Sequence, residues 1–593
     1  MDAAVALSVI IALVSVAVFA APYFRYRIHL GDDALVTLHR FSAFAECLKE
    51  GGWPCWWIHH DAFGLGSPTH LFYPTVALWP AFALHVFGVS LVRAIELAAV
   101  ANHLALGLVT WLVVRRRFSD VVALACATLV SLAPPHLLLL NQRSAYAEAW
   151  SLIAMVWAVS SWLDVTQPRQ RARAGQAEDR SCVAVSWLAL GLACTIMAHP
   201  LMMLLFAVPF AGLHLALWRS SAKHMRALTC AYLAALALSA HAWVPAVSEA
   251  AQLQTAALLT QGKYAYADHF YTSLWPLVAP ARGAWPVRLG VLATVAVLLS
   301  VLFPSLKRQG AAREIAHDAP RAPGDGRGLK PDARAALAGM SLVACLLATS
   351  FTQPIWTLLP PLRLAQFPWR YLTVALAFAV LPLAWMLDRL GQRVGGAASM
   401  RASLVFAGLV AAVMLWGAPA LKVVRGRDYD DARLLSAKAR CGSQYHGGMD
   451  YLARGVDAQR LEQAQQHRCD IPVAEVLGVA EGAVVSAHRS SQGIHARVRL
   501  REEALVRFGS MAFPGWQIRL RNAKEVLPID TAADDPFGQL RVRLPRGTHE
   551  VDAHFGWTFT RALAYAGSGL AWLVLFGTQM WPWLRRRRAS RTD

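Results

Sequence analysis

Long apolar runs, separated by short polar stretches, dominate the chain. Several runs reach the roughly 18 predominantly apolar residues that a membrane-spanning helix needs, and residues 285–303 form one that only Arg288 interrupts. This pattern predicts a polytopic α-helical membrane protein with about twelve transmembrane helices. The predicted helices span residues 4–21, 94–114, 119–139, 147–164, 183–199, 201–219, 227–247, 284–304, 335–351, 371–389, 402–420 and 562–583.

Residues 421–561 break the apolar pattern. Residues 482–500 and 539–544 alternate apolar and polar positions, and Pro545-Arg546-Gly547 has the composition of a turn before another strand at 549–555. Alternation with a period of two predicts strands with one buried face. We therefore expect a small β-sandwich-like domain here. The chain then divides into a helical module with an outer first loop at 22–93, a β-rich domain, and a final helix with a basic tail: 1–420, 421–561 and 562–593.

Charge sets the expected orientation in the membrane. The net charge of +20 is concentrated in short stretches between apolar runs, including 115–117, 169–180, 219–226, 307–334, 389–401 and 585–588. Because cytoplasmic loops carry an excess of Lys and Arg, these stretches and both termini are expected in the cytoplasm. The first loop and the β-rich domain are then extracytoplasmic. A basic chain of this kind gives no reason to expect nucleic acid as a partner.

The apolar run at residues 71–92 is the test of this orientation. If it crossed the membrane completely, every later loop would change sides and the basic stretches would face outward, against the charge rule. Its Pro74 and Pro80 are typical of a broken helix. We therefore expect this run to lie along the outer face or to dip into it.

The nine cysteines include no Cys-x-x-Cys pair, so the spacing indicates no metal motif. Cys47 with Cys55, and Cys441 with Cys469, fall in segments that we expect outside the cytoplasm, where disulfides are chemically allowed. Free thiols are the alternative for each pair, because a sequence does not give the Cα separation that a disulfide requires.

The first outer loop carries the densest candidate chemistry. Asp32 and Asp33 follow the first predicted helix, and His39-Arg40 come soon after. A carboxylate next to a membrane exit can act as a general base or bind a divalent metal. The alternative is that the two aspartates solvate a helix end.

Further candidates lie at other outer helix ends. Arg143 and Glu148 flank one short outer loop and are expected to pair, and His199 stands before Pro200 at another helix end. The stretch at 352–370 contains Arg363 and ends in Gln366-Phe367-Pro368-Trp369-Arg370. The planar guanidinium fork of arginine suits phosphate. A neighbouring aromatic can stack on a sugar or belong to an interfacial belt, and the belt is the alternative for Trp369.

Several motifs follow one another in a characteristic order. They are the acidic pair Asp32-Asp33, Gly51 to Trp57, Gly64-Leu65-Gly66-Ser67-Pro68, Phe72-Tyr73-Pro74, Glu148, His199-Pro200, Gln366 to Arg370, Asp450-Tyr451-Leu452 and Phe513-Pro514-Gly515-Trp516. Over most of its length the chain thus resembles bacterial membrane proteins described as 6-pyruvoyl-tetrahydropterin synthase-related, close to the YfhO-like group. These proteins belong to the wider GT-C superfamily of membrane glycosyltransferases, and the pterin name implies no pterin chemistry.

The resemblance implies transfer of a sugar from a polyprenyl-phosphate donor to a glycan, lipid or protein acceptor on the outer face of the bacterial inner membrane. It assigns the acceptor base to Asp33, with Asp32 as the second candidate. The family pattern has a histidine four residues after that aspartate, whereas Thr37 stands there in this chain and His39 comes two residues later. This departure leaves the role of His39 open.

Physical chemistry adds expectations about binding. The donor phosphate needs a cation, which Arg370 or Arg363 would supply. A divalent metal, Mg²⁺ or Mn²⁺, would be able to bridge carboxylate and phosphate, but the sequence does not decide whether one binds. The residues expected to contact substrate are His39, Arg40, Arg143, Glu148, His199, Arg363, Gln366, Trp369 and Arg370.

A non-catalytic protein that transports lipid-linked glycans, or helps to assemble them, is the alternative function. A transporter should place paired charges near the middle of the membrane. The strongest acidic candidates of this chain instead lie in an outer loop, which favours an enzyme.

Overall fold

The structure is a computed structural model, and it describes most of the chain. The described residues are 2–25, 31–73, 75–167, 174–254, 266–270, 329–396, 398–416, 451–465, 471–478, 482–521, 526–530 and 535–589. The predicted helix at 284–304 and the predicted pair Cys441–Cys469 lie outside these residues.

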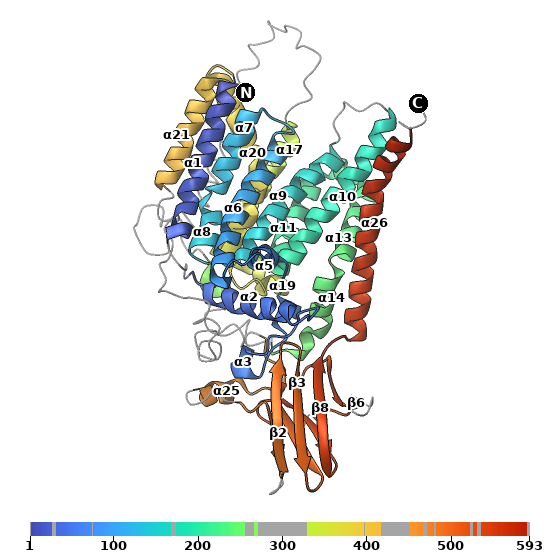
Figure 1. The fold of residues 1–593 in the computed structure, drawn as a ribbon. Coiled ribbons are helices and arrows are strands. Elements are labelled where there is room, and N and C mark those ends of the chain that lie inside the picture. The colour runs from blue at the N-terminus through green and yellow to red at the C-terminus, as the bar shows by residue number, and fades with distance from the viewer. Residues whose placement is uncertain are drawn as a thin grey trace.

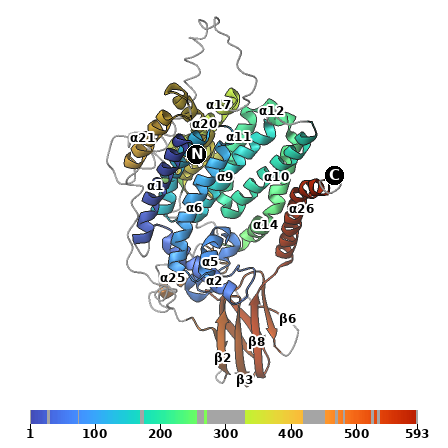
Figure 2. The same cartoon turned by 45° about the horizontal axis from the view of Figure 1, so that its top comes forward.

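Apolar helices form one bundle, and a β-domain lies at one end of it (Figure 1). Both chain termini lie at the opposite end of the bundle, and helix α2 lies across the end next to the β-domain (Figures 1 and 2). The longer helices are α1 (Ala3–Arg25), α2 (Ala34–Lys49), α6 (Leu91–Val114), α7 (Asp120–Ser131), α9 (Tyr146–Thr166), α10 (Ala174–Ala198), α11 (Pro200–Ala216), α13 (Met225–Leu238), α14 (Ala240–Glu249), α17 (Pro331–Leu347), α20 (Tyr371–Arg393), α21 (Met400–Trp416) and α26 (Phe559–Ala589).

Five described helices are long and apolar enough to cross a membrane, and the number rises to seven if two bent pairs each form one span. The expected count of twelve is therefore not confirmed. One bent pair replaces the predicted helix at 119–139: α7 ends at Ser131, α8 (Pro134–Asn141) follows, and their axes differ by 46°. Pro134 and Pro135 account for this break, because proline lacks the N–H that would continue the helix. The other pair, α13 and α14, replaces the predicted helix at 227–247 with a 70° bend.

The apolar run at residues 71–92 forms only short elements. A 3₁₀ turn, η1 (Thr75–Leu78), leads into α5 (Trp79–Val86), which has Pro80 in its first turn. Together they are far shorter than the roughly 20 residues of a complete span. Phe87, at the end of α5, is one of the most exposed apolar side chains among the described residues. The expectation that this run does not cross the membrane completely agrees with the structure.

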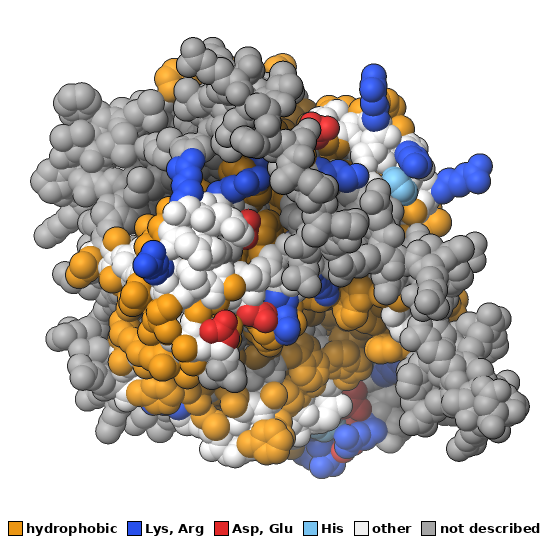
Figure 3. Space-filling model, turned by 90° about the horizontal axis from the view of Figure 1, so that it is seen from above, with side chains coloured by type: hydrophobic (Ala, Val, Ile, Leu, Met, Phe, Trp, Pro, Cys, Tyr) orange, Lys and Arg blue, Asp and Glu red, His pale blue; other side chains and the backbone are white. Residues whose placement is uncertain are grey.

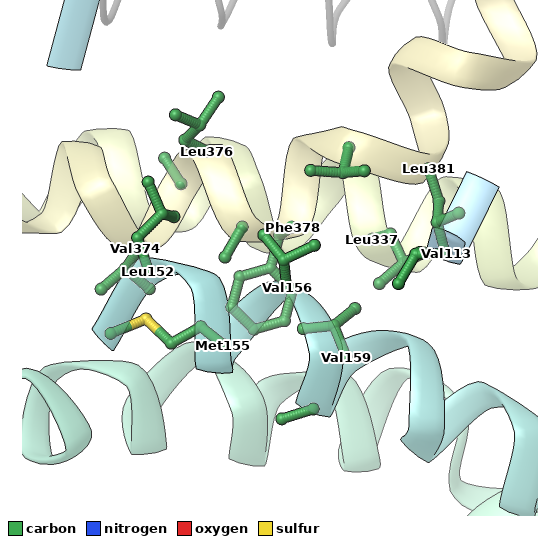
Figure 4. Close-up of a cluster of buried hydrophobic side chains, with 14 of the residues drawn as sticks. Val113, Leu152, Met155, Val156, Val159, Leu337, Val374, Leu376, Phe378 and Leu381 are labelled. Atoms are coloured by element: carbon green, nitrogen blue, oxygen red, sulfur yellow. The ribbon is translucent and has the colours of Figure 1, made fainter. Parts of the chain in front are cut away.

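The bundle has a tightly packed apolar core. Met155 and Val156 of α9 meet Leu337 of α17 and Phe378 of α20, and all four are almost completely buried (Figure 4). By contrast, only 28% of the apolar window of α1 and 17% of that of α26 are buried inside the protein. Helices that expose so much apolar surface need lipid around them.

Seen from the end that carries both termini, several Lys and Arg side chains stand out at the surface among apolar ones (Figure 3). Among the described residues, this face of the molecule therefore carries positive charge.

The β-domain consists of two antiparallel sheets, one ordered β1-β4-β7 and the other β2-β3-β8-β5-β6. Alternate residues of β3 are buried, as the period-two pattern predicts. The predicted segment at 482–500 is a hairpin whose two strands meet at Ser490 and Gly493. The strands are β1 (Ala474–Leu477), β2 (Gly482–Ser490), β3 (Gly493–Leu500), β4 (Ala504–Met511), β5 (Trp516–Leu520), β6 (Val526–Leu527), β7 (Gln539–Leu544) and β8 (Gly547–Phe555).

The segment at residues 56–71 and the β-domain share one apolar core. Trp57 is 4% exposed, and its ring lies 5.2 Å from that of Trp516 in β5. The backbone N–H of Met511 donates to the carbonyl of Leu65 at 2.9 Å. Residues separated by more than 400 positions thus form a single packing unit. Through it, the segment at residues 56–71 attaches the β-domain to the bundle.

A buried ion pair fixes the junction between bundle and β-domain. Arg561 in α26 is fully buried and donates to both carboxylate oxygens of Glu249 in α14, at 2.6 and 3.0 Å. It also donates to the carbonyls of Pro514 and Gly556. Gly515, next to Pro514, has a φ of +106°, and a Cβ there would lie 2.4 Å from the Arg561 guanidinium. The motif from Phe513 to Trp516 thus has a structural role, because it provides the space and a hydrogen-bond acceptor for Arg561.

Candidate functional site

Asp33 stands at the start of α2, on the end of the bundle that faces the β-domain. The backbone N–H groups of Asp32 and Asp33 donate to the carbonyls of Gln142 and Arg143 at 3.0 and 2.8 Å. An aspartate at a helix start usually accepts a hydrogen bond from the first helical turn, but the Asp33 side chain makes no such bond. The carboxylate is instead 48% exposed, so a substrate is able to reach it.

A chain of charged side chains connects Asp33 with Arg370. The Arg143 guanidinium lies 3.7 Å from the Asp33 carboxylate and donates to Glu148 at 2.8 Å. Arg370 donates to the other Glu148 oxygen at 2.7 Å. Glu148, in the first turn of α9, is only 2% exposed. The structure therefore brings Asp33, Arg143, Glu148 and Arg370 together, although they come from three separate parts of the sequence.

Aromatic rings hold the cations of this cluster. The Arg143 guanidinium lies 4.2 Å from the centre of the Trp369 ring, and the Arg40 guanidinium lies 4.2 Å from that of Tyr73. Such contacts fix a guanidinium without neutralising it. Tyr73 was not expected at the site, although the sequence singled out the Phe72-Tyr73-Pro74 stretch. Its ring also meets the edge of His199, with centroids 5.9 Å apart.

Strained backbone also marks this region. Four described residues other than glycine have a positive φ: Ala62, Phe63, Ser144 and Gln366. Ser144 follows Arg143, Gln366 lies in the turn before Arg370, and the other two follow Asp61. Arg370 donates to the carbonyl of Ala365 at 2.6 Å and so supports the strained turn. Conformations of this kind cost about 1–3 kcal/mol each and cluster at functional sites.

The electrostatics favour proton transfer at Asp33. Partial burial raises the pKa of Asp33, and the attraction of Arg143 opposes this rise without cancelling it. Burial likewise raises the pKa of Tyr73 to about 12, so its hydroxyl stays protonated at neutral pH. A carboxylate with a raised pKa is a stronger base than an ordinary aspartate.

His39 belongs to a separate, buried network. Its Nε2 donates to Asp61 Oδ1 at 2.7 Å, while Ser67 and Thr69 donate to Asp61 Oδ2 at 2.5 and 2.6 Å. Although burial alone raises it, the pKa of Asp61 is lowered to about 2, because these donors stabilise the carboxylate. His39 is itself 4% exposed. Asp61 is thus a partner of His39 that the sequence analysis missed, and the expected substrate contact of His39 stays a prediction.

Three other residues that the sequence analysis expected at the site, Arg363, His199 and Asp32, make no side-chain contact with Asp33 among the interactions described. Arg363 donates to the backbone carbonyls of Trp356 and Thr357 in α18 (Gln353–Leu358), and this helix end satisfies the guanidinium. His199 accepts a hydrogen bond from the Met202 N–H and begins α11. Asp32 is exposed and acts on Arg143 only through its charge, whereas Asp33 lies within 3.7 Å of that guanidinium.

A divalent metal at Asp33 stays a prediction. Both Glu148 oxygens already accept hydrogen bonds from arginines. Among the described residues, the three-membered group of potential ligands lies elsewhere, at Glu46, His59 and His60. A Mg²⁺ or Mn²⁺ ion at Asp33 would therefore depend on oxygen ligands from the donor phosphate and water.

Comparisons with known proteins give only distant likenesses. No family model and no curated protein matches the chain. The solved structures similar to it include the Archaeoglobus fulgidus oligosaccharyltransferase tethered to an acceptor peptide (13% identity, TM-score 0.39, covering 72% of this chain and 56% of that one). ArnT from Cupriavidus metallidurans, bound to undecaprenyl phosphate, has 12% identity and a TM-score of 0.27 and covers 71% and 88%. Likenesses this weak do not identify a family.

Proposed function

We propose that this chain is a membrane glycosyltransferase. It moves a sugar from a polyprenyl-phosphate donor to a glycan, lipid or protein acceptor on the extracytoplasmic side of a bacterial inner membrane. In this orientation the β-domain and Asp33 face outward, and both termini face the cytoplasm, as the positive-inside rule requires. The motif order that resembles GT-C enzymes and the chemistry of the Asp33 cluster support the proposal.

One observation carries it: an accessible carboxylate with a raised pKa lies 3.7 Å from an arginine that is itself fixed by a buried glutamate. Glycosyl transfer needs both of these features. The acceptor hydroxyl needs a base, and the departing phosphate needs a cation. The cluster lies at the end of the bundle where the head group of a lipid-linked donor would emerge.

The proposed step balances as follows. Asp33 takes the proton of the acceptor hydroxyl while its oxygen attacks the anomeric carbon of the donor sugar. A new glycosidic bond forms, and the bond between the anomeric carbon and the phosphate oxygen breaks. Polyprenyl phosphate leaves with the electron pair. Arg143 stabilises the phosphate charge, and Arg40, 4.2 Å from the Tyr73 ring, adds positive charge nearby.

Glu148 and Arg370 position the reacting groups. Because Glu148 binds both arginines, it fixes the Arg143 guanidinium beside Asp33. Arg370 is 7% exposed and holds the strained turn at Gln366. We therefore assign Arg143 as the phosphate-binding arginine and Arg370 as a positioning residue, with Trp369 as the ring that braces Arg143.

Purified protein in lipid nanodiscs tests the proposal. We expect release of polyprenyl phosphate from at least one donor of a panel of polyprenyl-phosphate sugars, and we expect Asp33→Asn to reduce it by about 10²–10⁴-fold. Asp32→Asn is the matched control and should keep most of the activity. Transport of a lipid-linked glycan without cleavage of any donor would instead favour the transporter.

A further inference from the structure

Three metal-ligating side chains converge at the far part of α2. Glu46 on α2 faces His59 and His60 of the following loop, and one ligand atom from each residue lies within 4.8 Å of the other two. Glu46 Oε2 and His60 Nε2 are 3.7 Å apart, and the two imidazole centroids are also 3.7 Å apart. This is a three-ligand constellation from two different elements.

The surrounding structure holds these ligands in place. The disulfide between Cys47 and Cys55, with Cα atoms 5.9 Å apart, ties the residue after Glu46 to the loop that carries both histidines. Arg489 of the β-domain donates to the His59 carbonyl at 3.4 Å. Asp61, next to His60, is anchored by its buried network. A ligand set held from both sides loses little conformational entropy when it binds an ion.

From this geometry we propose that Glu46, His59 and His60 bind Zn²⁺. Two imidazoles and one carboxylate are the protein ligands of many zinc sites that keep a fourth position open. The Zn–N distance of about 2.0–2.1 Å places two ligands of a tetrahedral site about 3.4 Å apart. The 3.7 Å between Glu46 and His60 is already close to this value, and no two ligand atoms of the group are more than 4.8 Å apart.

The ion has a route to the site. The side chains of Glu46 and His60 are 30% and 24% exposed, whereas His59 is 9% exposed. Water is therefore able to occupy the fourth position. The histidines favour Zn²⁺ over Mg²⁺, Ca²⁺ and Mn²⁺, which prefer oxygen ligands.

This site differs in place and chemistry from Asp33. Glu46 follows Asp33 by about 13 residues along α2, which corresponds to about 20 Å at 1.5 Å per residue. A zinc ion at Glu46 would therefore not contact the sugar donor. Instead it ties the loop at residues 59–60 to α2, and this loop also contributes Trp56 and Trp57 to the core of the β-domain. The proposal stands independently of the proposed transferase activity.

The test measures bound metal on tag-free, full-length protein in nanodiscs. The protein is stripped with a chelator, equilibrated with equal concentrations of Zn²⁺ and Mg²⁺, freed of unbound metal and analysed by mass spectrometry. We expect about one zinc per chain for the wild type and far less for Glu46→Gln and for His60→Asn. His488→Asn is the matched control, because His488 also lies beside another histidine, His495, at 5.8 Å, and it should retain the zinc.

A second set of measurements begins with the wild-type protein alone. Co²⁺ bound to the stripped wild-type protein should give the visible absorption of a tetrahedral site, and Zn²⁺ should abolish it. Zinc should also raise the thermal midpoint of the wild type but not that of Glu46→Gln, whose metal-free midpoint should match that of stripped wild type. Wild-type protein that binds no zinc, or folded variants that keep the full amount, would overturn the proposal.

Discussion

Asp33 and Asp61 belong to the same outer loop, yet their surroundings act on them in opposite ways. Asp33 is 48% exposed and its pKa is raised, whereas Asp61 is 2% exposed and its pKa is lowered to about 2. Three donors satisfy Asp61, whereas the Asp33 carboxylate makes no capping bond and lies 3.7 Å from Arg143, whose attraction does not cancel the effect of burial. Two carboxylates in one region whose pKa values are shifted in opposite directions usually have different roles.

The comparison teaches which carboxylate stabilises the fold and which performs chemistry. An ionised group that the fold stabilises contributes to the free energy of unfolding, as Asp61 does. A carboxylate whose pKa the fold raises contributes no such stability, and a residue of this kind persists when function needs it. Asp33 is therefore the better candidate base, although Asp61 makes more hydrogen bonds.

The largest change in stability should follow from removing the charge of Glu148, which binds both Arg143 and Arg370. Glu148→Gln leaves Arg143 and Arg370 buried without their counter-charge, and the loss of a buried partner costs about 3–5 kcal/mol. The free energy of unfolding should fall by this amount, and release of polyprenyl phosphate should disappear.

Asp164→Asn is the control for that variant. Asp164 pairs with Arg116 and Arg117, with a more exposed side chain (21%). Its loss should cost less stability and leave the activity per folded molecule unchanged. Equal losses of activity in both variants would contradict a special role for Glu148.

Asp61→Asn should reduce stability by about 2–4 kcal/mol, since it leaves buried donors poorly matched. The remaining activity per folded molecule should be close to that of the wild type. The pKa shift also predicts a pH dependence. Because the folded-state pKa of about 2 lies below the ordinary value, Asp61 contributes roughly 2 kcal/mol above about pH 4. Unfolding curves of the wild type should therefore show a loss of this contribution between about pH 4 and pH 2. Unfolding curves of Asp61→Asn should not show it.

A pair of arginine variants sharpens the assignment of the site. Arg370 donates to both Glu148 and Ala365, and a lysine ammonium does not reproduce this fork. Arg370→Lys should therefore lower the release rate by about tenfold, or ~1.4 kcal/mol. Arg363→Lys, at the end of α18, should leave the rate almost unchanged. A larger loss of rate in Arg363→Lys than in Arg370→Lys would indicate that the donor phosphate binds near Arg363 instead.

The smallest predicted effect is a shift in the pH profile. Asp33 has to be ionised to accept a proton, so activity should fall as the pH drops through its raised pKa. The acid limb of the rate profile should therefore lie above the value of about 3.9 for an ordinary aspartate. A limb at or below that value would remove Asp33 as the titrating base.

The sequence predicted the class of fold and the segments of the site, but not which residues of those segments meet. Hydropathy located α1, α6 and α9, because span length is a local property. The bend at Pro134-Pro135 replaces the continuous helix predicted at 119–139, although two adjacent prolines are a local signal for a break. The shared core of Trp57 and Trp516 was not predictable, since no local pattern specifies a contact across so many residues.

His39 and Arg40 are neighbours in the sequence but have different surroundings, and helix geometry explains this difference. Both residues lie in α2 (Ala34–Lys49), a helix that the apolar pattern did not predict, and Asp33 stands at its start. At about 100° per residue, a position six residues along a helix points about 240° away, whereas one seven residues along returns to the same face. Arg40 accordingly shares the electrostatic environment of Asp33, while His39 points to Asp61.

The most direct test measures, for Asp33→Asn and Asp61→Asn together, both the thermal midpoint and the release of polyprenyl phosphate per folded molecule. We predict that Asp33→Asn folds with an unchanged or higher midpoint and loses release by about 10²–10⁴-fold. Asp61→Asn should show a lower midpoint with nearly full release. Full release by folded Asp33→Asn, or loss of release only in proportion to unfolding in both variants, would contradict the assignment of Asp33 as the catalytic base.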